Sequence, residues 1–167
     1  EADTGILLIA TSGCLAMCGD GAIGIVTFGI ENGLIKTRTP GRFVADVPAG
    51  KIELNYQQEG NRVRSVRIRN VPSYLVEEGI KIEVPGFGPL SVDVAYGGNF
   101  YAIIEPQGPY RGLDQMGATH ILVTSPVVRD FIRARFEPVH PLDPTIRGVS
   151  HVMWTDAPQG AGADVMK

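Results

Sequence analysis

Two cysteines near the start of the chain are the side chains best suited to chemistry, and Cys18 is the stronger candidate. Cys18 opens the stretch Cys18-Gly19-Asp20-Gly21, which directly precedes an apolar run that we expect to be helical. At a helix N-terminus, unpaired backbone N–H groups and the helix dipole favour a bound anion and the ionised form of a thiol. Glycines there let a carboxylate or phosphate approach the backbone. On the residues alone, a cysteine is more often a small buried hydrophobic residue, so both interpretations stay open.

The helix that would position Cys18 is predicted over residues 20–32 and has no polar face. Its apolar side chains point in every direction around a 3.6-residue turn: Ala22, Ile23, Ile25, Val26, Phe28 and Ile30. Such a helix has to be enclosed, and it is too short to span a bilayer, so we expect the buried axis of a soluble domain. Gly24 and Gly29 would each cost the helix about 1 kcal/mol relative to alanine. This suggests that neighbouring strands approach too closely for a side chain.

The composition is that of an ordinary soluble domain of 167 residues with a net charge of −3. The charge provides no electrostatic reason to expect nucleic acid or an anionic membrane as a partner. Two cysteines do not make a disulfide framework, and we find no signal peptide and no apolar run long enough to cross a membrane. We therefore expect a cytoplasmic protein by default, and a thiol of low pKa would stay reduced there. The sequence is compatible with a homodimer but does not fix the oligomeric state.

Short strands with one apolar face are predicted on both sides of a hinge at Pro85–Pro89. This segment holds four turn formers in five residues, so we place a domain boundary there, with 1–88 before it and 89–167 after it. Ser125-Pro126 has the residue types of a helix N-cap and first helical position, which predicts an amphipathic surface helix that begins there. The small and polar residues 159–167 are expected to form a disordered tail.

The three histidines are first interpreted as structural. His120 precedes an apolar run, His140 lies beside Pro141 as a loop anchor, and His151 lies inside a predicted final strand. No pair of His, Cys or carboxylate residues has a recognised metal-ligand spacing, so we expect no metal site.

Several segments nevertheless resemble the proline racemase and hydroxyproline 2-epimerase family. MCGDGAIG is similar to the family signature MCGHGTIG, and further segments follow in the family's order and spacing: GCLAMCG, RTPG (38–41), VPAG (47–50), NVPSYL (70–75), DVAYGGNFYAIIEPQ (93–107) and HPLDPTIRGVSHVMWT (140–155). Together they cover nearly the whole chain. The YGGNFYAI and SHV-x-W segments most resemble the 4-hydroxyproline 2-epimerase branch.

The resemblance implies a fold, a reaction and site residues. The fold is α+β of the diaminopimelate-epimerase type, in which two pseudo-symmetric halves each wrap a mixed sheet around a central buried helix. The reaction inverts Cα of 4-hydroxyproline, from trans-4-hydroxy-L-proline to cis-4-hydroxy-D-proline, with two cysteines as base and acid and without pyridoxal phosphate, metal or nucleotide. Cys18 matches one catalytic thiol, the amides of Gly19 and Asp20 bind the substrate carboxylate, and His151 matches a position that contacts substrate.

By the same resemblance, the chain is expected to be an internal fragment. The second catalytic thiol lies in a family segment resembling DRSPCGTGT, which should follow Trp154, and the family's opening segment should precede Glu1. The chain would then hold most of one half and the front of the other. We expect such a fragment to be inactive by itself, because half an acid–base pair cannot complete the proton exchange.

The chain also departs from the family motif. Asp20 stands where the family has histidine, Ala22 where it has threonine, and Ala16 where it has proline. A carboxylate beside the thiol opposes its ionisation and repels an anionic substrate, so we expect weaker activity or a shifted substrate. Two alternatives therefore accompany the epimerase: a trans-3-hydroxy-L-proline dehydratase of the same family, and a relative that binds an imino acid without turning it over.

Overall fold

The chain folds into two compact units, Glu1–Pro72 and a second that begins at Ser73. The computed structural model describes residues 1–11 and 13–158, so the predicted disordered tail lies outside the described residues. The division differs from the predicted boundary at Pro85–Pro89. Residues 85–87 form the tight turn between two strands that pair with each other, and Gly88 and Pro89 begin the second of these strands, with Val84 opposite Gly88. Proline and glycine favour a turn whether the turn joins two strands or two domains, so their presence did not distinguish a hairpin from a hinge.

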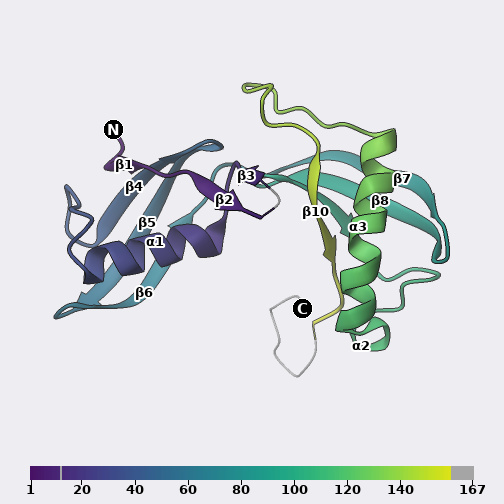
Figure 1. Ribbon diagram of the computed structural model, residues 1–167, viewed down its shortest axis with the longest axis horizontal. Coiled ribbons are helices and arrows are strands. Elements are labelled where there is room, and N and C mark those ends of the chain that lie inside the picture. Colours follow the sequence, from purple (N-terminus) through teal and green to yellow (C-terminus); the bar gives the residue numbers. More distant parts are fainter. Residues whose placement is uncertain (12, 159–167) are drawn as a thin grey trace. The chain divides into compact units, whose positions relative to one another are not determined.

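The first unit is a mixed four-stranded sheet packed against one helix (Figure 1). The strand order is β1-β4-β5-β6, with β1 parallel to β4 and the other pairs antiparallel, and β2 and β3 form a separate small hairpin. In chain order the elements are β1 (Thr4–Gly5), β2 (Leu8–Ala10), β3 (Gly13–Leu15), α1 (Gly19–Glu31), β4 (Arg42–Val47), β5 (Gly50–Glu59) and β6 (Arg62–Arg69).

The core of this unit comes from alternate residues of the central strands. Phe43 and Ala45 on β4 and Ile52 and Leu54 on β5 are essentially inaccessible to solvent, while the residues between them face outward. Successive side chains of a strand point to opposite faces of the sheet, so one apolar face is available to the helix. The helix α1 closes this face with its buried residues, which include Val26.

The helix α1 is covered on one side only by the described residues. Ala22, Val26 and Gly29 are buried, whereas Phe28 is 62% exposed and Ile25 is 36% exposed. The prediction of a helix at this position is confirmed, but the expected enclosure on all sides is not found within these residues. One sheet can cover only the stripe of a helix that faces it.

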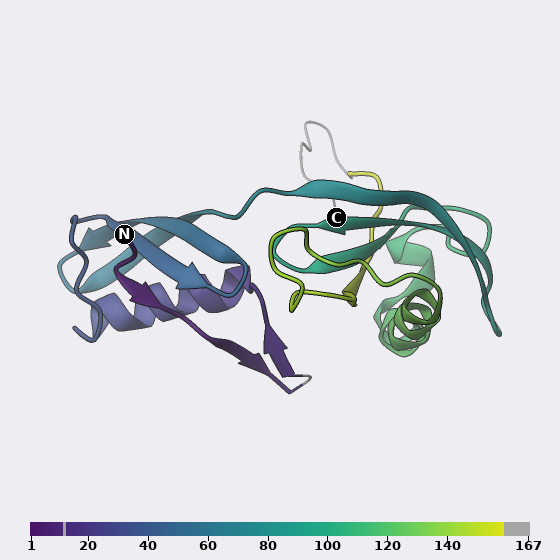
Figure 2. The same cartoon turned by 90° about the horizontal axis from the view of Figure 1, so that it is seen from above.

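The second unit is also a mixed four-stranded sheet with a long helix on one face, as Figure 2 shows. Its strand order is β10-β9-β8-β7, with β10 parallel to β9 and the other pairs antiparallel. The elements are β7 (Tyr74–Val84), β8 (Gly88–Tyr96), β9 (Phe100–Ile104), α2 (Leu113–Met116), α3 (Ala118–Arg135) and β10 (Val149–Trp154). The parallel pair is joined by a helical crossover, as parallel strands require. The predicted α+β class with mixed sheets is therefore confirmed.

The long helix α3 begins at Ala118, before the predicted start at Ser125, and Pro126 lies inside it. Thr124, Val128 and Ile132 are its buried residues, and their four-residue spacing places them on one face. Burial of this face against the sheet offsets the loss of one backbone hydrogen bond at the proline. The Ser125 hydroxyl donates to the Ile121 carbonyl at 2.6 Å instead of capping the helix.

Among residues 1–11 and 13–158, no helix has both the length and the apolar character needed to cross a bilayer. In the same ranges, no three His, Cys, Asp or Glu side chains gather closely enough to hold a metal ion.

Gly24 and Gly29 of α1 differ in what surrounds them. A methyl group on Gly29 would lie 2.6 Å from Ile35 Cγ1 and closer still to Cδ1, whereas one on Gly24 would meet nothing within 4 Å. The predicted close approach is therefore found at Gly29, from a side chain after the helix rather than from a strand, and is absent at Gly24 among the described residues.

We therefore expect Gly24→Ala to raise the free energy of unfolding by about 1 kcal/mol, because only helix propensity changes. Gly29→Ala should lower it by about 1 kcal/mol, because steric overlap outweighs the same propensity gain. Urea denaturation followed by circular dichroism measures both. In an Ile35→Ala background most of the Gly29→Ala penalty should disappear; equal effects of the two glycine variants would contradict this account.

Candidate functional site

Cys18 is the N-cap of α1. Its backbone is extended, with φ −146° and ψ 113°, and its sulfur accepts a hydrogen bond from the Gly21 N–H at 3.4 Å. The Cys18 carbonyl accepts from the Ala22 N–H at 3.0 Å, which is the first bond of the helix. Cys18 is partly exposed and free of any disulfide. The sulfur thus lies at the mouth of the helix, as predicted, and is not packed away as a small hydrophobic residue.

The residues before Cys18 hold it in place. Met17 is almost fully buried, at 3% exposure, and Ala16 accepts a hydrogen bond from the Ala49 amide at 3.0 Å. Because the preceding two residues are anchored to the unit's core and to the turn between β4 and β5, Cys18 has little freedom to move along the helix axis. Cys14 differs, since it is exposed on the β2–β3 hairpin opposite Ile9.

The first turn of α1 leaves backbone donors available for an anion. The N–H groups of Gly19 and Asp20 have no acceptor inside the helix, as holds for the first residues of any α-helix. A side chain at Gly21 would lie 3.1 Å from Leu8 Cδ2 and 3.3 Å from the Cys18 sulfur. Glycine at position 21 therefore keeps the sulfur and the amide together, and the turn can receive a carboxylate beside the thiol.

Asp20 is exposed in this first turn. A negative side chain near a helix N-terminus stabilises the helix through the dipole. The same charge lies close to the amides that would bind an anion, so it competes with that anion for the positive end of the helix. Asp20 therefore stabilises the helix but weakens the binding of an anion at the helix N-terminus.

His151 lies in the second unit, on β10, in a defined polar environment. Its Nδ1 is 2.7 Å from the Ser150 hydroxyl, and its ring is stacked on Tyr101 with centroids 5.2 Å apart and planes 21° from parallel. Burial lowers the pKa of His151 below its ordinary value, and the positive charges of Arg129 and Arg133 on α3 lower it further. His151 is therefore neutral at pH 7, a state in which one ring nitrogen donates and the other accepts.

The other two histidines have structural partners. His140 Nδ1 accepts from the amides of Leu142 and Asp143, at 3.3 and 3.2 Å, which confirms its predicted role as a loop anchor. His120 contacts the edge of Phe87. Both fit a structural role.

Sequence reasoning missed Tyr96. Its ring lies against His140, with centroids 4.8 Å apart, and its hydroxyl is the one side-chain polar atom that is buried without a hydrogen-bond partner among the described residues. Burial and the neighbouring Tyr74 and Asp143 raise the Tyr96 pKa. The sequence signals were a tyrosine at the end of an alternating strand and its place in the YGGNFYAI segment, and neither distinguishes a satisfied hydroxyl from an unsatisfied one.

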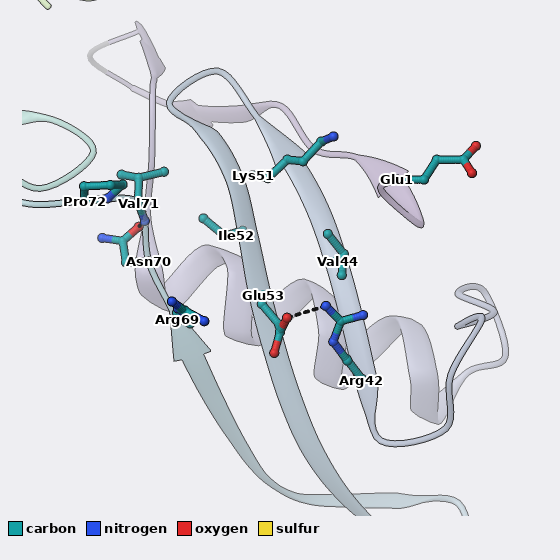
Figure 3. Close-up of a pocket in the computed structure, with 10 residues that line it drawn as sticks. All are labelled: Glu1, Arg42, Val44, Lys51, Ile52, Glu53, Arg69, Asn70, Val71 and Pro72. Carbon is teal, nitrogen blue, oxygen red and sulfur yellow. Dashed lines mark hydrogen bonds and ion pairs between the residues drawn. The ribbon is translucent and has the colours of Figure 1, made fainter.

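A charged depression of about 580 Å³ lies elsewhere in the first unit (Figure 3). It is lined by side chains of both signs, and Arg42 forms an ion pair with Glu53 inside it. Figure 3 shows these side chains in front of the strands, with α1 behind the sheet. The full lining is Glu1, Arg42, Val44, Lys51, Ile52, Glu53, Arg69, Asn70, Val71 and Pro72. None of the predicted site residues belongs to it.

Comparison with known proteins decides the family. The family model described as proline racemase matches residues 1–167. The chain belongs to the proline racemase family. The 4-hydroxyproline 2-epimerase of Paracoccus denitrificans is 50% identical over 163 residues, which are 98% of this chain and 49% of that protein. The enzyme of the same name from Shewanella loihica is 51% identical over 155 residues, covering 93% of this chain and 46% of that protein.

Solved structures of the proline racemase family agree with the fold. A hydroxyproline epimerase from Agrobacterium vitis, with bound trans-4-hydroxy-L-proline, matches with a TM-score of 0.83 and 28% identity, over 94% of this chain and 46% of that one. The chain thus spans about half the length of the relatives it matches. Within it, Cys18, Gly19 and Asp20 lie together at the head of α1, and His151 lies on β10 of the second unit.

Two substitutions separate the contribution of Cys18 to stability, as the cap of α1, from the proposed role of its thiol. Cys18→Ser retains a side-chain acceptor, and serine is a preferred N-cap residue, so the free energy of unfolding should stay the same or rise by about 0.5 kcal/mol. Cys18→Ala removes the acceptor and should lower it by about 1 kcal/mol. Urea denaturation compares the two variants. Equal losses would show that the sulfur does not cap the helix.

The charge state of His151 can be measured by NMR titration. Its midpoint should lie below the 6.5 of an unperturbed imidazole, so the neutral form stabilises the fold above pH 6.5, and this contribution is lost as the pH falls through the lowered pKa. Arg129→Gln should move the midpoint upward but not fully to 6.5, because burial remains. Arg135→Gln, on the same helix, is the matched control and should leave it unchanged. A wild-type midpoint at or above 6.5 would refute the assignment.

Proposed function

We propose that the chain is part of a cofactor-independent 4-hydroxyproline 2-epimerase in which Cys18 is one of two acid–base thiols. The observation that carries the proposal is Cys18, a free and partly exposed residue at the N-terminus of α1 beside the amides of Gly19 and Asp20, which have no acceptor inside the helix. The relatives named 4-hydroxyproline 2-epimerase and the structure with bound trans-4-hydroxy-L-proline support this choice of substrate.

The arrangement at Cys18 suits proton transfer at a carbon next to a carboxylate. In the proposed reaction, the amides of Gly19 and Asp20 hold the substrate carboxylate, which places Cα near the sulfur. The thiolate takes the Cα proton and becomes a thiol, and a second thiol gives its proton to the opposite face of the carbanion and becomes a thiolate. The configuration inverts and no proton is gained or lost overall. Donors at the carboxylate stabilise the negative charge that develops during the step.

The second thiol and the substrate contact of His151 are parts of the same proposal. By resemblance, the second thiol comes from a family segment that follows Trp154, and His151 contacts the substrate from β10. Asp20 weakens carboxylate binding by its charge, which favours reduced turnover or a shifted substrate. We also propose a cytoplasmic location, because the mechanism requires both thiols to stay reduced. The homodimer remains a prediction.

The deciding experiment is isotope exchange with the intact protein in heavy water. With trans-4-hydroxy-L-proline as substrate, an epimerase incorporates deuterium at Cα and forms the cis-D isomer. Loss of water from trans-3-hydroxy-L-proline would instead identify the dehydratase, and binding without exchange would identify the non-catalytic relative. Either outcome would overturn the proposal.

The role of Cys18 is tested in the same assay. Cys18→Ala should lower the exchange rate by about 10²–10⁴-fold, because a positioned acid–base group contributes that much and Cys18 takes the Cα proton in the proposed reaction. Cys14→Ala, the matched control on the exposed hairpin, should retain the rate. Pyrrole-2-carboxylate, a planar mimic of the carbanion, should protect Cys18 but not Cys14 from alkylation.

A further inference from the structure

Ser150 lies next to His151 at an irregularity in strand β10. The register pairs Val149 with Phe100 and then His151 with Tyr101, so Ser150 is an extra residue on β10. Such a bulge redirects side chains and is common beside functional sites. Val149, the residue before Ser150, is bound to α3, because Arg133 Nε on that helix donates a hydrogen bond to the Val149 carbonyl at 2.6 Å. The position of the Ser150 side chain is therefore set by the sheet on one side and by α3 on the other.

The hydroxyl of Ser150 has two neighbours but only one proton. Its oxygen lies 3.1 Å from the Phe100 carbonyl and 2.7 Å from His151 Nδ1. A carbonyl oxygen can only accept, so the hydroxyl proton goes to Phe100, and the hydroxyl oxygen accepts from His151. The proton of a neutral His151 ring is thereby assigned to Nδ1 by the network itself.

The remaining ring nitrogen of His151 is then a hydrogen-bond acceptor. No hydrogen bond to Nε2 comes from any residue in the described part of the chain. The stack on Tyr101 fixes the plane of the ring, and burial with the two nearby arginines keeps the ring neutral by lowering its pKa. A neutral ring in a fixed plane with its proton on Nδ1 presents the Nε2 lone pair in one direction.

We infer that Ser150 is a positioning residue: it holds His151 in the tautomer with the proton on Nδ1, so that Nε2 accepts a hydrogen bond from a donor group of the ligand. The part that concerns the ligand rests on the proposed function, in which His151 contacts the substrate. A hydroxyproline carries two groups of this class, the ring hydroxyl and the secondary ammonium, and both complement a lone pair. A carboxylate, which only accepts hydrogen bonds, does not.

The tautomer is tested on the chain itself by ¹⁵N NMR of the histidine rings. We expect His151 to show a protonated Nδ1 and an unprotonated Nε2 above its titration midpoint. Ser150→Ala should move the ring toward the Nε2–H form or a mixture, and Ser150→Thr, which retains the hydroxyl, should restore the wild-type pattern. An Nε2–H form in the wild type, or an unchanged pattern in Ser150→Ala, would overturn the inference.

The consequence for binding is tested by kinetics on the intact protein. Ser150→Ala should raise KM for trans-4-hydroxy-L-proline about tenfold with kcat nearly unchanged, because one hydrogen bond common to ground and transition states is lost. Ser150→Thr should recover most of the affinity, and Ser65→Ala, on exposed strand β6, is the matched control. If proline shows the same rise in KM, the donor is the ammonium; if only hydroxyproline does, the donor is the ring hydroxyl.

The two proposals fail in distinguishable ways. If the intact protein turns over neither substrate, the proposed function is wrong, while the NMR pattern still decides whether Ser150 sets the tautomer. If turnover is normal and KM does not change in Ser150→Ala, the inference about Ser150 is wrong and the proposed function stands.

Discussion

The hydrogen bond from the Gly21 amide to the Cys18 sulfur joins the fold of the first unit to its proposed catalytic residue. It exists because α1 begins at Gly19, and α1 begins there because Met17 is anchored in the core and Val26 packs against the sheet. A residue larger than glycine at position 21 would crowd both the sulfur and Leu8. The position of the Cys18 sulfur thus depends on the packing of a whole helix against a sheet, and the proposed site is therefore a property of the unit rather than of a short motif.

Both units contain antiparallel strands and a crossover helix between parallel strands, but these elements follow in opposite order along the chain. The first begins with a strand, crosses over through α1 and continues into the antiparallel strands β4, β5 and β6; the second begins with three antiparallel strands and ends with the crossover through α3 to β10. In both, the parallel pair flanks the crossover helix. The N-termini of the two helices nevertheless differ. The head of α1 is capped by a cysteine, whereas α3 follows Gly117 and has no side-chain cap.

The sequence predicted those features that depend on neighbouring residues and missed those that depend on packing. Strand alternation and the apolar helix over 20–32 were correct, as was the position of Cys18 at the head of that helix, because each follows from residue types a few positions apart. The start of α3 was wrong, because burial of Val128 and Ile132 overrides the preference of Pro126 for a first turn. The contribution of Ser150 could not be foreseen, since it arises from a shift in register between β9 and β10 that only the assembled sheet defines.

The uncovered side of α1 has a practical consequence for work with this chain. Phe28 and Ile25 present aliphatic and aromatic surface to water from a rigid helix, and Leu34 is also exposed just beyond its end. Exposed apolar side chains of this kind promote self-association, and a net charge of only −3 supplies little repulsion between copies. Copies of this chain are therefore expected to associate more readily as the protein concentration rises.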